Sequence, residues 1–290
     1  MPSMKPFALL LALIALTLLA ASAQTSVPDA SRIVAIGAGI AETIYALKAE
    51  ARLVGVDTSS NYPEAATGLP QVGYRKSIAV EGVLALRPTL VIATDDSGPP
   101  LALEQIRAAG VTVLILKDEP SVAGAKQKIL GIAKALALDS RGSDLTRGID
   151  RDLATARVYY TRITTRPKVM FLYSTTQGAL TVSGTGTAAD AMIRLAGGVN
   201  AVNGYSGYKP INAESVAAAN PDVIALLDRG LTAVGGLEGL LSSPGIAATK
   251  AGKAGRVVAF DGTYLLGFSP RVGKAVLDLM FALYPELKRP

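Results

Sequence analysis

EGVLALRPTLVIATD, residues 81–95, returns later in the chain in a closely related form, ESVAAANPDVIALLD, residues 214–228. In both stretches a glutamate is followed seven residues later by a proline, then by a short apolar run and an aspartate. The part before the proline has the spacing of a short helix, and the apolar run after it is typical of a buried strand. The repeat therefore predicts two copies of one helix–strand unit.

Around the first copy, strands and helices alternate along the chain. We expect strands at 32–36, 52–56, 89–93 and 111–116, and helices at 41–49, 81–86 and 101–110. Such alternation is typical of a parallel sheet with helices on both faces. The alternation restarts with a strand at 168–173.

The segment between the copies predicts a long helix over residues 139–164. It contains few helix breakers, and its apolar residues recur every three or four positions until Arg166-Pro167 ends the pattern. We therefore expect an α/β fold of two Rossmann-like lobes, residues 24–138 and 166–290, joined by a single long helix at 139–165. Ligands of open α/β sheets lie beyond the carboxyl ends of the strands, so a ligand cleft is expected between the lobes.

The N-terminal residues have the features of an export signal. Lys5 precedes a run of 14 mostly apolar residues, which is short for a membrane span. Ala-Ser-Ala at 21–23 is a small-residue cleavage site. We expect residues 1–23 to be a signal peptide and the exported, soluble chain to begin at Gln24.

The composition excludes several classes of function. The 290 residues include no histidine and no cysteine, so the usual zinc and copper sites and the His-dependent catalytic relays are excluded. Any metal must be held by oxygen from Asp, Glu, Tyr or a carbonyl. The net charge of +6 comes from scattered basic residues, which makes nucleic acid a poor partner.

One stretch imitates a dinucleotide-binding fingerprint. Gly37 and Gly39 follow the strand at 32–36, and Asp57 lies about 20 residues further on. Glu42 holds the place of the third glycine, where its charge would face a pyrophosphate. A tight strand–helix turn is the favoured interpretation, and an exported oxidoreductase is the alternative.

The repeat, the connecting helix and the export signal together resemble the periplasmic binding proteins that serve ABC importers for metal chelates. Within that family, GYRKSIAVEGVLALRPTLVIATD (73–95) and SGTGTAADAMIRLAGG (183–198) are similar to the haem-binding branch. The resemblance covers nearly the whole mature chain. It implies a monomeric periplasmic protein, not an enzyme, that binds haem and delivers it to an ABC permease dimer in the inner membrane. A carrier of ferric siderophores or another metal chelate is the alternative.

The resemblance also implies roles for single residues. Tyr74 corresponds to the tyrosine that ligates haem iron in this branch, a ligation that suits a hard phenolate oxygen. Arg75 and Lys76 follow it and would favour the phenolate or pair with haem propionates. The family often has an arginine two residues after its tyrosine, a place that Lys76 holds here, so which cation makes the contact stays open. A second-lobe histidine ligand, found in some members, has no counterpart in this chain.

Three further side chains are candidates for the cleft in the second half. Arg229 follows the repeated strand, and its guanidinium is suited to holding a carboxylate. Tyr205 and Tyr208, in NGYSGYKP, occupy the place that corresponds to Tyr74. They either line the cleft or pack on their own lobe.

The two glutamates of the repeat, Glu81 and Glu214, correspond to the residues that dock on permease arginines in the family. Their matched distance from the proline in both copies favours docking to a basic partner. The alternative is that each acid merely suits the positive end of its helix dipole.

Overall fold

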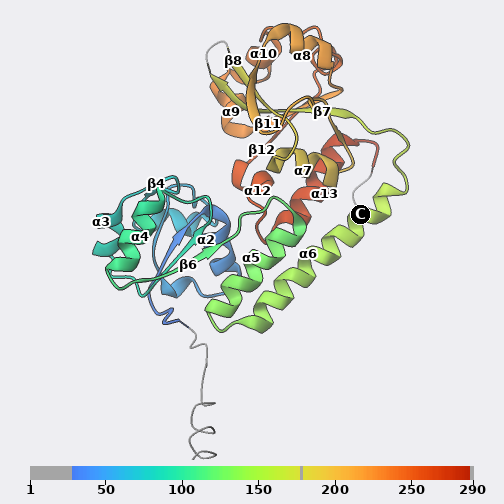
Figure 1. Cartoon of the computed structure of the whole chain (residues 1–290). Helices are drawn as coiled ribbons and strands as arrows, with labels where there is room; N and C mark the ends of the chain where they lie inside the picture. The colour runs from blue at the N-terminus through green and yellow to red at the C-terminus, as the bar shows by residue number, and fades with distance from the viewer. Residues whose placement is uncertain (1–27, 177–178, 288–290) are drawn as a thin grey trace, which may run out of the picture.

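The first copy of the repeat lies at the centre of a four-stranded parallel sheet in the computed structural model (Figure 1). β5 (Leu90–Thr94) pairs with β1 (Ile33–Ile36) on one side and β6 (Thr112–Leu116) on the other. β2 (Leu53–Val56) completes the order β2-β1-β5-β6. The structure describes residues 28–176 and 179–287, so the signal peptide expected at residues 1–23 lies outside the described residues.

Alternating side chains of this sheet fill two cores. Ile33 and Ala35 of β1 pack on one face with α2 (Ala38–Ala46) and α5 (Val122–Ala135). The opposite face is covered by α3 (Val80–Ala85) and α4 (Pro100–Ala108). The predicted parallel sheet with helices on both faces is confirmed.

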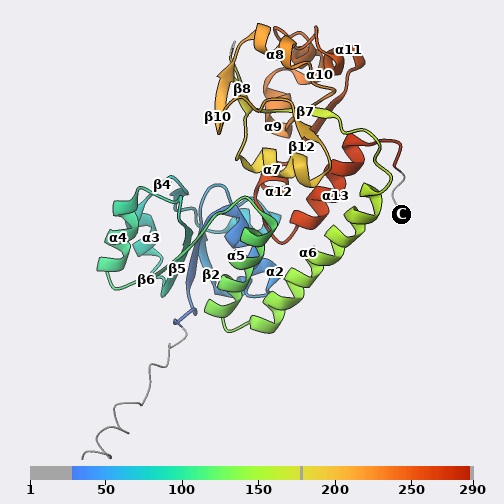
Figure 2. The same cartoon turned by 45° about the vertical axis from the view of Figure 1, so that its right-hand side comes forward.

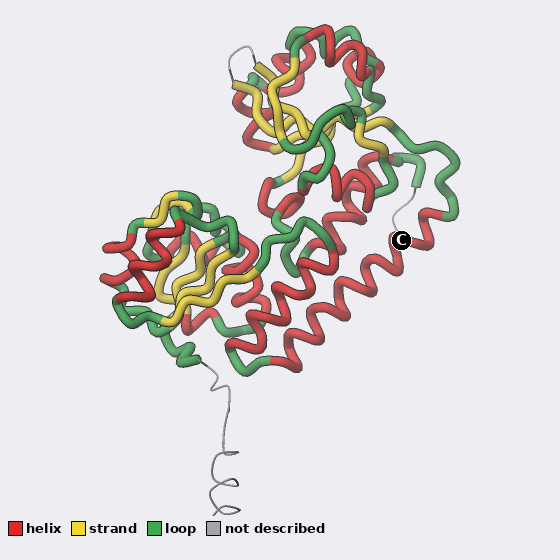
Figure 3. Tube along the Cα trace, viewed as in Figure 1, coloured by secondary structure: helices red, strands yellow, loops and turns green. Residues whose placement is uncertain are grey.

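The second lobe contains a six-stranded mixed sheet in which the repeated strand is again an interior strand. The strands of this sheet are β7 (Lys168–Thr176), β8 (Ala179–Ser183), β9 (Val199–Asn200), β10 (Tyr208–Ile211), β11 (Val223–Leu227) and β12 (Val257–Phe260). The repeated strand, β11, pairs in parallel with β7 and β12, and two antiparallel strands, β8 and β10, extend the sheet beyond β7. Figure 3 shows the strands of each lobe gathered in its interior with helices around them.

The helices of the second lobe divide between the two faces of its sheet. These helices are α7 (Ala188–Leu195), α8 (Ala213–Ala219), α9 (Asp228–Ala233), α10 (Gly236–Leu241), α11 (Lys250–Ala254), α12 (Gly262–Leu266) and α13 (Val272–Leu283). α7 and α13 pack on one face of the sheet, and α8, α10 and α11 pack on the other. α9 and α12 follow the carboxyl ends of β11 and β12.

The helix predicted between the lobes is α6 (Asp139–Tyr160), which ends five residues before the predicted limit of 165. Thr161 ends it, and Ile163 packs against the core of the second lobe instead of continuing the helix. α6 is also not alone, because α5 packs along its N-terminal half and α13 along its C-terminal half (Figures 1 and 2). α5 occupies residues 122–135, for which no helix or strand is predicted above.

The strand–helix turn favoured for the glycine-rich stretch is also present. Gly37 has a φ of +124°, which glycine adopts readily, and it precedes α2. Asp57 is buried, and its carboxylate accepts hydrogen bonds from the Gly37 amide at 2.9 Å and from the hydroxyls of Ser59 and Ser60. The spacing of about 20 residues thus reflects a carboxylate that fixes the turn from inside. No helix in the described part of the chain combines the length and the apolar character that a membrane span needs.

Candidate functional site

A cleft of about 470 Å³ lies between the two lobes. Its walls are the loops at the carboxyl ends of the central strands of both sheets, as the fold class predicts. From the first lobe come Gly37–Ile40, Thr58, Ser59, Asn61, Tyr74, Arg75, Thr94, Asp118 and Lys128. From the second come Tyr173, Leu227, Asp228, Arg229, Asp261, Gly262, Thr263, Leu266 and Gly267.

Tyr74 is presented to the cleft by a two-stranded hairpin, β3 (Gly73–Tyr74) and β4 (Ser77–Ile78). Backbone hydrogen bonds fix the hairpin at both ends: the Gly73 carbonyl accepts from Thr58, and the Arg75 carbonyl accepts from Gly98 at 2.8 Å. The tyrosine side chain is 46% exposed. It is therefore held in place by the backbone while its ring remains open to a ligand.

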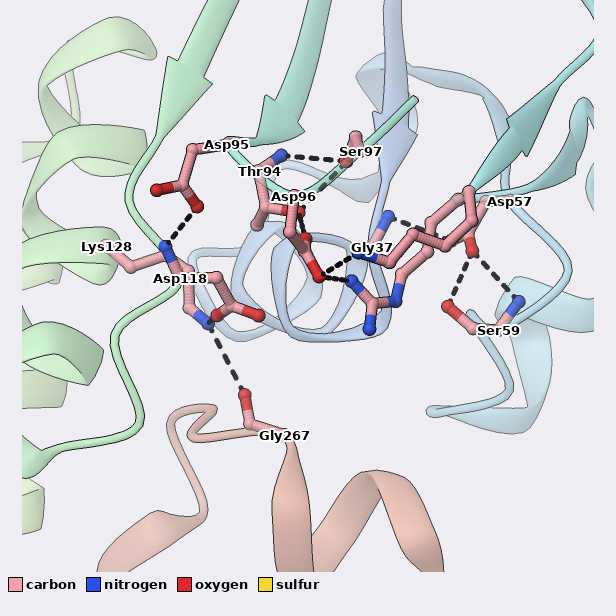
Figure 4. A network of polar contacts seen from close by, with 12 residues as sticks. Gly37, Asp57, Ser59, Thr94, Asp95, Asp96, Ser97, Asp118, Lys128 and Gly267 are labelled. Atoms are coloured by element: carbon pink, nitrogen blue, oxygen red, sulfur yellow. Dashed lines mark hydrogen bonds and ion pairs between the residues drawn. The ribbon is translucent and has the colours of Figure 1, made fainter. Parts of the chain in front are cut away.

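The two cations after Tyr74 converge on one carboxylate, that of Asp96. Arg75 Nη1 and Lys76 Nζ both contact Asp96 Oδ2, the lysine at 2.8 Å. The Thr94 hydroxyl donates to the other oxygen, Oδ1, at 2.7 Å (Figure 4). The Ser97 hydroxyl is hydrogen-bonded to both the amide and the hydroxyl of Thr94. Burial alone would raise the pKa of Asp96, but hydrogen bonds from these three side chains outweigh it and hold the pKa well below its usual range. Asp96 is thus charged at neutral pH.

Of the two cations, Arg75 lines the cleft and Lys76 does not. Burial lowers the pKa of Arg75, and the hydrogen bond and charge of Asp96 more than compensate, so its pKa is raised. Lys76 is about half exposed and contacts the Asp96 carboxylate at 2.8 Å. Arg75 is accordingly the cation of this pair that can reach a ligand in the cleft.

The second lobe contributes a tyrosine that sequence reasoning missed. Tyr173 of β7 lines the cleft with its ring 39% exposed, and it stacks on Tyr208 at a centroid distance of 4.4 Å. Tyr208 lies behind it, outside the cleft lining. Burial raises the pKa of Tyr208, so its phenol stays neutral.

Tyr205 and Arg229, the other two candidates of the second lobe, differ in their placement. Tyr205 packs on its own lobe, with Lys209 over its ring at 5.2 Å, and does not line the cleft. Arg229 begins α9 directly after β11 and does line it. Within the described residues no ion pair involves Arg229, so its guanidinium is available to an anionic group.

The floor of the cleft contains an ion pair between a buried lysine and a partly exposed aspartate. Lys128 of α5 is 4% exposed, and its ammonium contacts Asp118 Oδ1 at 2.5 Å and the Gly267 carbonyl of the second lobe at 3.4 Å (Figure 4). The lysine therefore links the two lobes beneath the site.

A second link between the lobes uses the glutamate of the glycine-rich stretch. Glu42 is 2% exposed and accepts two hydrogen bonds from Arg271, at 2.9 and 2.7 Å, and one from the Ser269 hydroxyl at 2.6 Å. The Arg271 guanidinium lies over the ring of Tyr62 at 3.5 Å and that of Tyr264 at 4.8 Å. Glu42 thus fixes the second lobe to the first instead of facing a phosphate.

The repeated glutamates occupy matching places in the two lobes. Glu81 is the second residue of α3 and Glu214 the second residue of α8, and both are exposed. Figures 1 and 2 place α3 and α8 at the ends of their lobes that lie away from α6. Neither acid contributes to the cleft.

Among the described residues no group of three or more acidic side chains is placed to hold a bare metal ion. The polar and aromatic side chains that face the cleft instead suit an extended ligand with its own anionic groups. Two α/β lobes with such a cleft between them define a bilobed ligand-binding protein. The chain belongs to the periplasmic binding protein family, a family of substrate-binding proteins, which matches residues 33–264.

Solved structures agree with this assignment. RhuT, a periplasmic haem-binding protein from Roseiflexus sp. RS-1 in apo form, is 45% identical with a TM-score of 0.85, and the match covers 89% of this chain and 99% of RhuT. BhuT, a periplasmic haem-binding protein in complex with two haems, is 44% identical with a TM-score of 0.83, covering 87% of this chain and 97% of BhuT.

A more distant relative by sequence is YvrC, an ABC transporter substrate-binding lipoprotein of Bacillus subtilis (strain 168). It is 26% identical over 261 residues, which cover 89% of this chain and 81% of YvrC. The resemblance drawn from the repeat and the Tyr74 motif is therefore confirmed at the level of the family.

Proposed function

We propose that this protein binds haem in the cleft between its lobes and delivers it to an ABC importer. The observation that carries the proposal is the placement of Tyr74. A half-exposed phenol stands on a fixed hairpin at a cleft, beside a cation, in a chain that has no histidine or cysteine. The similarity to RhuT and BhuT over nearly their whole length supports the same ligand.

In this proposal the Tyr74 oxygen is an axial ligand of the haem iron. A phenol has a pKa of roughly 10 in water, and both Fe(III) and a nearby cation favour its phenolate. Arg75 is the cation in the lining of the cleft next to Tyr74. The chain thus supplies both the ligand atom and the charge that stabilises it.

The remaining lining residues fit the rest of the haem molecule. Arg75 and Arg229 approach from opposite lobes and are suited to the two propionates, since guanidinium–carboxylate hydrogen bonds are strong. Tyr173 presents a ring from the second lobe that can pack on the porphyrin. Lys76 does not contact the haem in this proposal but contacts Asp96, and Tyr208 likewise does not contact the haem but packs on Tyr173.

Delivery would use a different surface from binding. Glu81 and Glu214 are exposed, one in each lobe, and we propose that they dock on basic residues of a permease dimer in the inner membrane. The protein then acts in the periplasm as a monomeric carrier and not as an enzyme. Membership of the periplasmic binding protein family supports this location.

The test is a comparison of haemin spectra for the purified wild type, Tyr74→Phe and Tyr205→Phe. The first variant removes only the proposed ligand oxygen, and the second removes a hydroxyl from a tyrosine outside the cleft. We expect the wild type and Tyr205→Phe to show the charge-transfer band of a tyrosinate-ligated ferric haem. Tyr74→Phe should lose that band and bind haemin more weakly. An unchanged spectrum in Tyr74→Phe would refute the ligation, and a wild type that gives no ligated haem spectrum would favour a siderophore or another chelate.

A further inference from the structure

The carboxylate of Asp96 lies between the two cations of the hairpin and contacts both of them. Arg75 and Lys76 both direct a nitrogen at the same oxygen, Asp96 Oδ2. No sequence motif singled out this contact, because Asp96 lies 21 residues after Arg75. The Asp96 carboxylate therefore already neutralises part of the positive charge that Arg75 and Lys76 place beside Tyr74.

The carboxylate is fixed on its other side as well. Its second oxygen, Oδ1, accepts the Thr94 hydroxyl, and Thr94 is in turn hydrogen-bonded to the buried Ser97 hydroxyl at 2.9 Å. The side chain of Asp96 is only about one third exposed, and that of Arg75 less. An ion pair in this partly desolvated setting is screened less by water and salt than a surface pair.

The charges of this cluster show what the carboxylate does to an incoming anion. Arg75 and Lys76 together carry two positive charges, and Asp96 reduces the sum to one (2 − 1 = 1). A ligand carboxylate that binds Arg75 must then share it with Asp96 and lie close to another negative charge. Like charges at such distances repel measurably in a partly desolvated site.

We propose that Asp96 is an internal competitor for the carboxylates of the cargo, which limits how tightly the cleft holds an anionic porphyrin. The proposal rests on the proposed function, since it assumes that the cargo brings carboxylates to Arg75. A carrier must also release its cargo to a permease, and a competing carboxylate at the contact makes release faster. Asp96 is thus a residue that sets affinity without touching the iron ligand.

A purely structural role for Asp96 predicts the opposite result. If Asp96 served only to orient Arg75, its removal would loosen the guanidinium and weaken binding, because ordering a long side chain costs free energy on association. The sign of the change in affinity therefore distinguishes competition from orientation.

The experiment compares wild type, Asp96→Asn and Asp95→Asn. Asp95 is the matched control: it lies next to Asp96 in the turn after β5, its replacement changes the net charge equally, and its carboxylate accepts the Asp118 amide at 2.9 Å. Among the described residues it forms no ion pair with Arg75 or Lys76. The probes are metal-free protoporphyrin IX, its dimethyl ester and haemin, each followed by its own absorption or fluorescence.

We expect Asp96→Asn to bind protoporphyrin IX about three- to tenfold more tightly than the wild type, as suits one partly screened charge near the ligand. The gain should shrink as salt is raised. The dimethyl ester, which has no carboxylates, should bind all three proteins alike, and Asp95→Asn should match the wild type throughout. Equal or weaker binding of protoporphyrin IX by Asp96→Asn would overturn the proposal, as would an equal gain for the ester.

The metal-free probe keeps this test separate from the question of ligation. If haemin gives no tyrosinate spectrum but Asp96→Asn still binds protoporphyrin IX more tightly, the iron ligation is wrong and the competition stands. If haemin is ligated normally and Asp96→Asn shows no gain, the competition is wrong and the proposed function stands. A wild type that binds neither haemin nor protoporphyrin IX would overturn both.

Discussion

At the scale of single residues, the tyrosines of the cleft differ in what surrounds them. Tyr74 stands next to Arg75, and both line the cleft. Tyr173 packs on another tyrosine, Tyr208, and no cation lies over its ring among the described residues. In the proposed function the same side-chain type therefore serves as an oxygen ligand on one wall and as an aromatic surface on the other.

The three candidate cations, Arg75, Arg229 and Lys76, should also differ in how much each contributes to haemin binding. We expect Arg75→Ala and Arg229→Ala each to weaken haemin binding by about 1–3 kcal/mol, the usual worth of a hydrogen bond to a charged group. Lys76→Ala should cost less, because the lysine contacts Asp96 and does not line the cleft. Titration of haemin into each variant measures the three values.

Lys209→Ala is the control for this series, since Lys209 lies over Tyr205 outside the cleft. Its affinity should equal that of the wild type. If Arg75→Ala and Arg229→Ala also bind haemin like the wild type, the propionates are held by other groups.

At the scale of elements, the hairpin that carries Tyr74 depends on one glycine. Gly73 has a φ of +93°, and a Cβ at this position would lie 2.6 Å from the Ser77 carbonyl oxygen. A side chain here is excluded both by the backbone conformation and by the facing strand. In the Gly-Tyr pair of the motif, the turn therefore requires Gly73, and Gly73 allows the hairpin to present Tyr74.

Gly73→Ala should consequently damage both folding and binding. Placing a non-glycine residue in the left-handed region costs about 1–2 kcal/mol, and the contact with Ser77 adds to it. We expect a lower midpoint of thermal unfolding and weaker haemin binding with an altered charge-transfer band, because Tyr74 moves with the hairpin. Calorimetry and the haemin titration measure the two effects.

Gly68→Ala is the matched comparison for this variant. A Cβ at Gly68 meets nothing within 4 Å, and its φ lies outside the left-handed region. This substitution should leave both measurements near those of the wild type. Similar losses in the two variants would show that the hairpin turn is not the cause.

The elements also show what the sequence could and could not predict. The repeated unit was predictable because each step of its pattern is local: helix spacing, a proline, an apolar run. The early end of α6 was not, since Tyr160 and Ile163 make contacts with the second lobe that lie far along the chain. α5 had a detectable signal, a Ser121 N-cap whose hydroxyl accepts from the Gly124 amide.

The residues of the candidate site also fall into those that local patterns predict and those that depend on distant contacts. Tyr74, Arg75 and Arg229 follow strands or turns that local patterns predict, and the structure brings all three to the cleft. The contact of Glu42 with Arg271 joins residues 229 positions apart, and no local pattern predicts it. Asp96 was visible as an acid after a strand, but its two cationic partners were not.

At the scale of the whole molecule, two buried charged side chains of the first lobe, Glu42 and Lys128, contact the second lobe beneath the cleft. Glu42 with Arg271, and Lys128 with Gly267, join the first lobe to the second. Removing Arg271 is costly, because the buried charge of Glu42 is left without its partner. The lobes are therefore held in a defined mutual orientation, which also fixes the separation of Glu81 and Glu214.

That fixed separation gives a prediction about delivery. Replacing both Glu81 and Glu214 with Gln removes two charges while preserving side-chain size. The double variant should bind haemin with a normal spectrum and affinity, since neither acid lines the cleft. It should fail to deliver haem through the transporter in reconstituted vesicles, and the single variants should be impaired less because one docking contact remains.

The matched control replaces Glu64 and Glu238 with Gln. Each is an exposed acid in the first turn of a short helix, one in each lobe, so the change in charge and in helix-dipole interaction is the same. This variant should deliver haem normally. Normal delivery by the Glu81/Glu214 variant as well would mean that the repeated acids only suit their helix ends.

The helices between the lobes have a consequence for how the chain is made. Ala125 of α5, and Ile149 and Ala156 of α6, belong to the core that α13 closes. A ribosome completes α6 more than a hundred residues before it reaches Val272–Leu283. α5 is made before α6 and can cover part of its apolar side at once, but the part that α13 covers stays exposed on the nascent chain until Val272–Leu283 has been made.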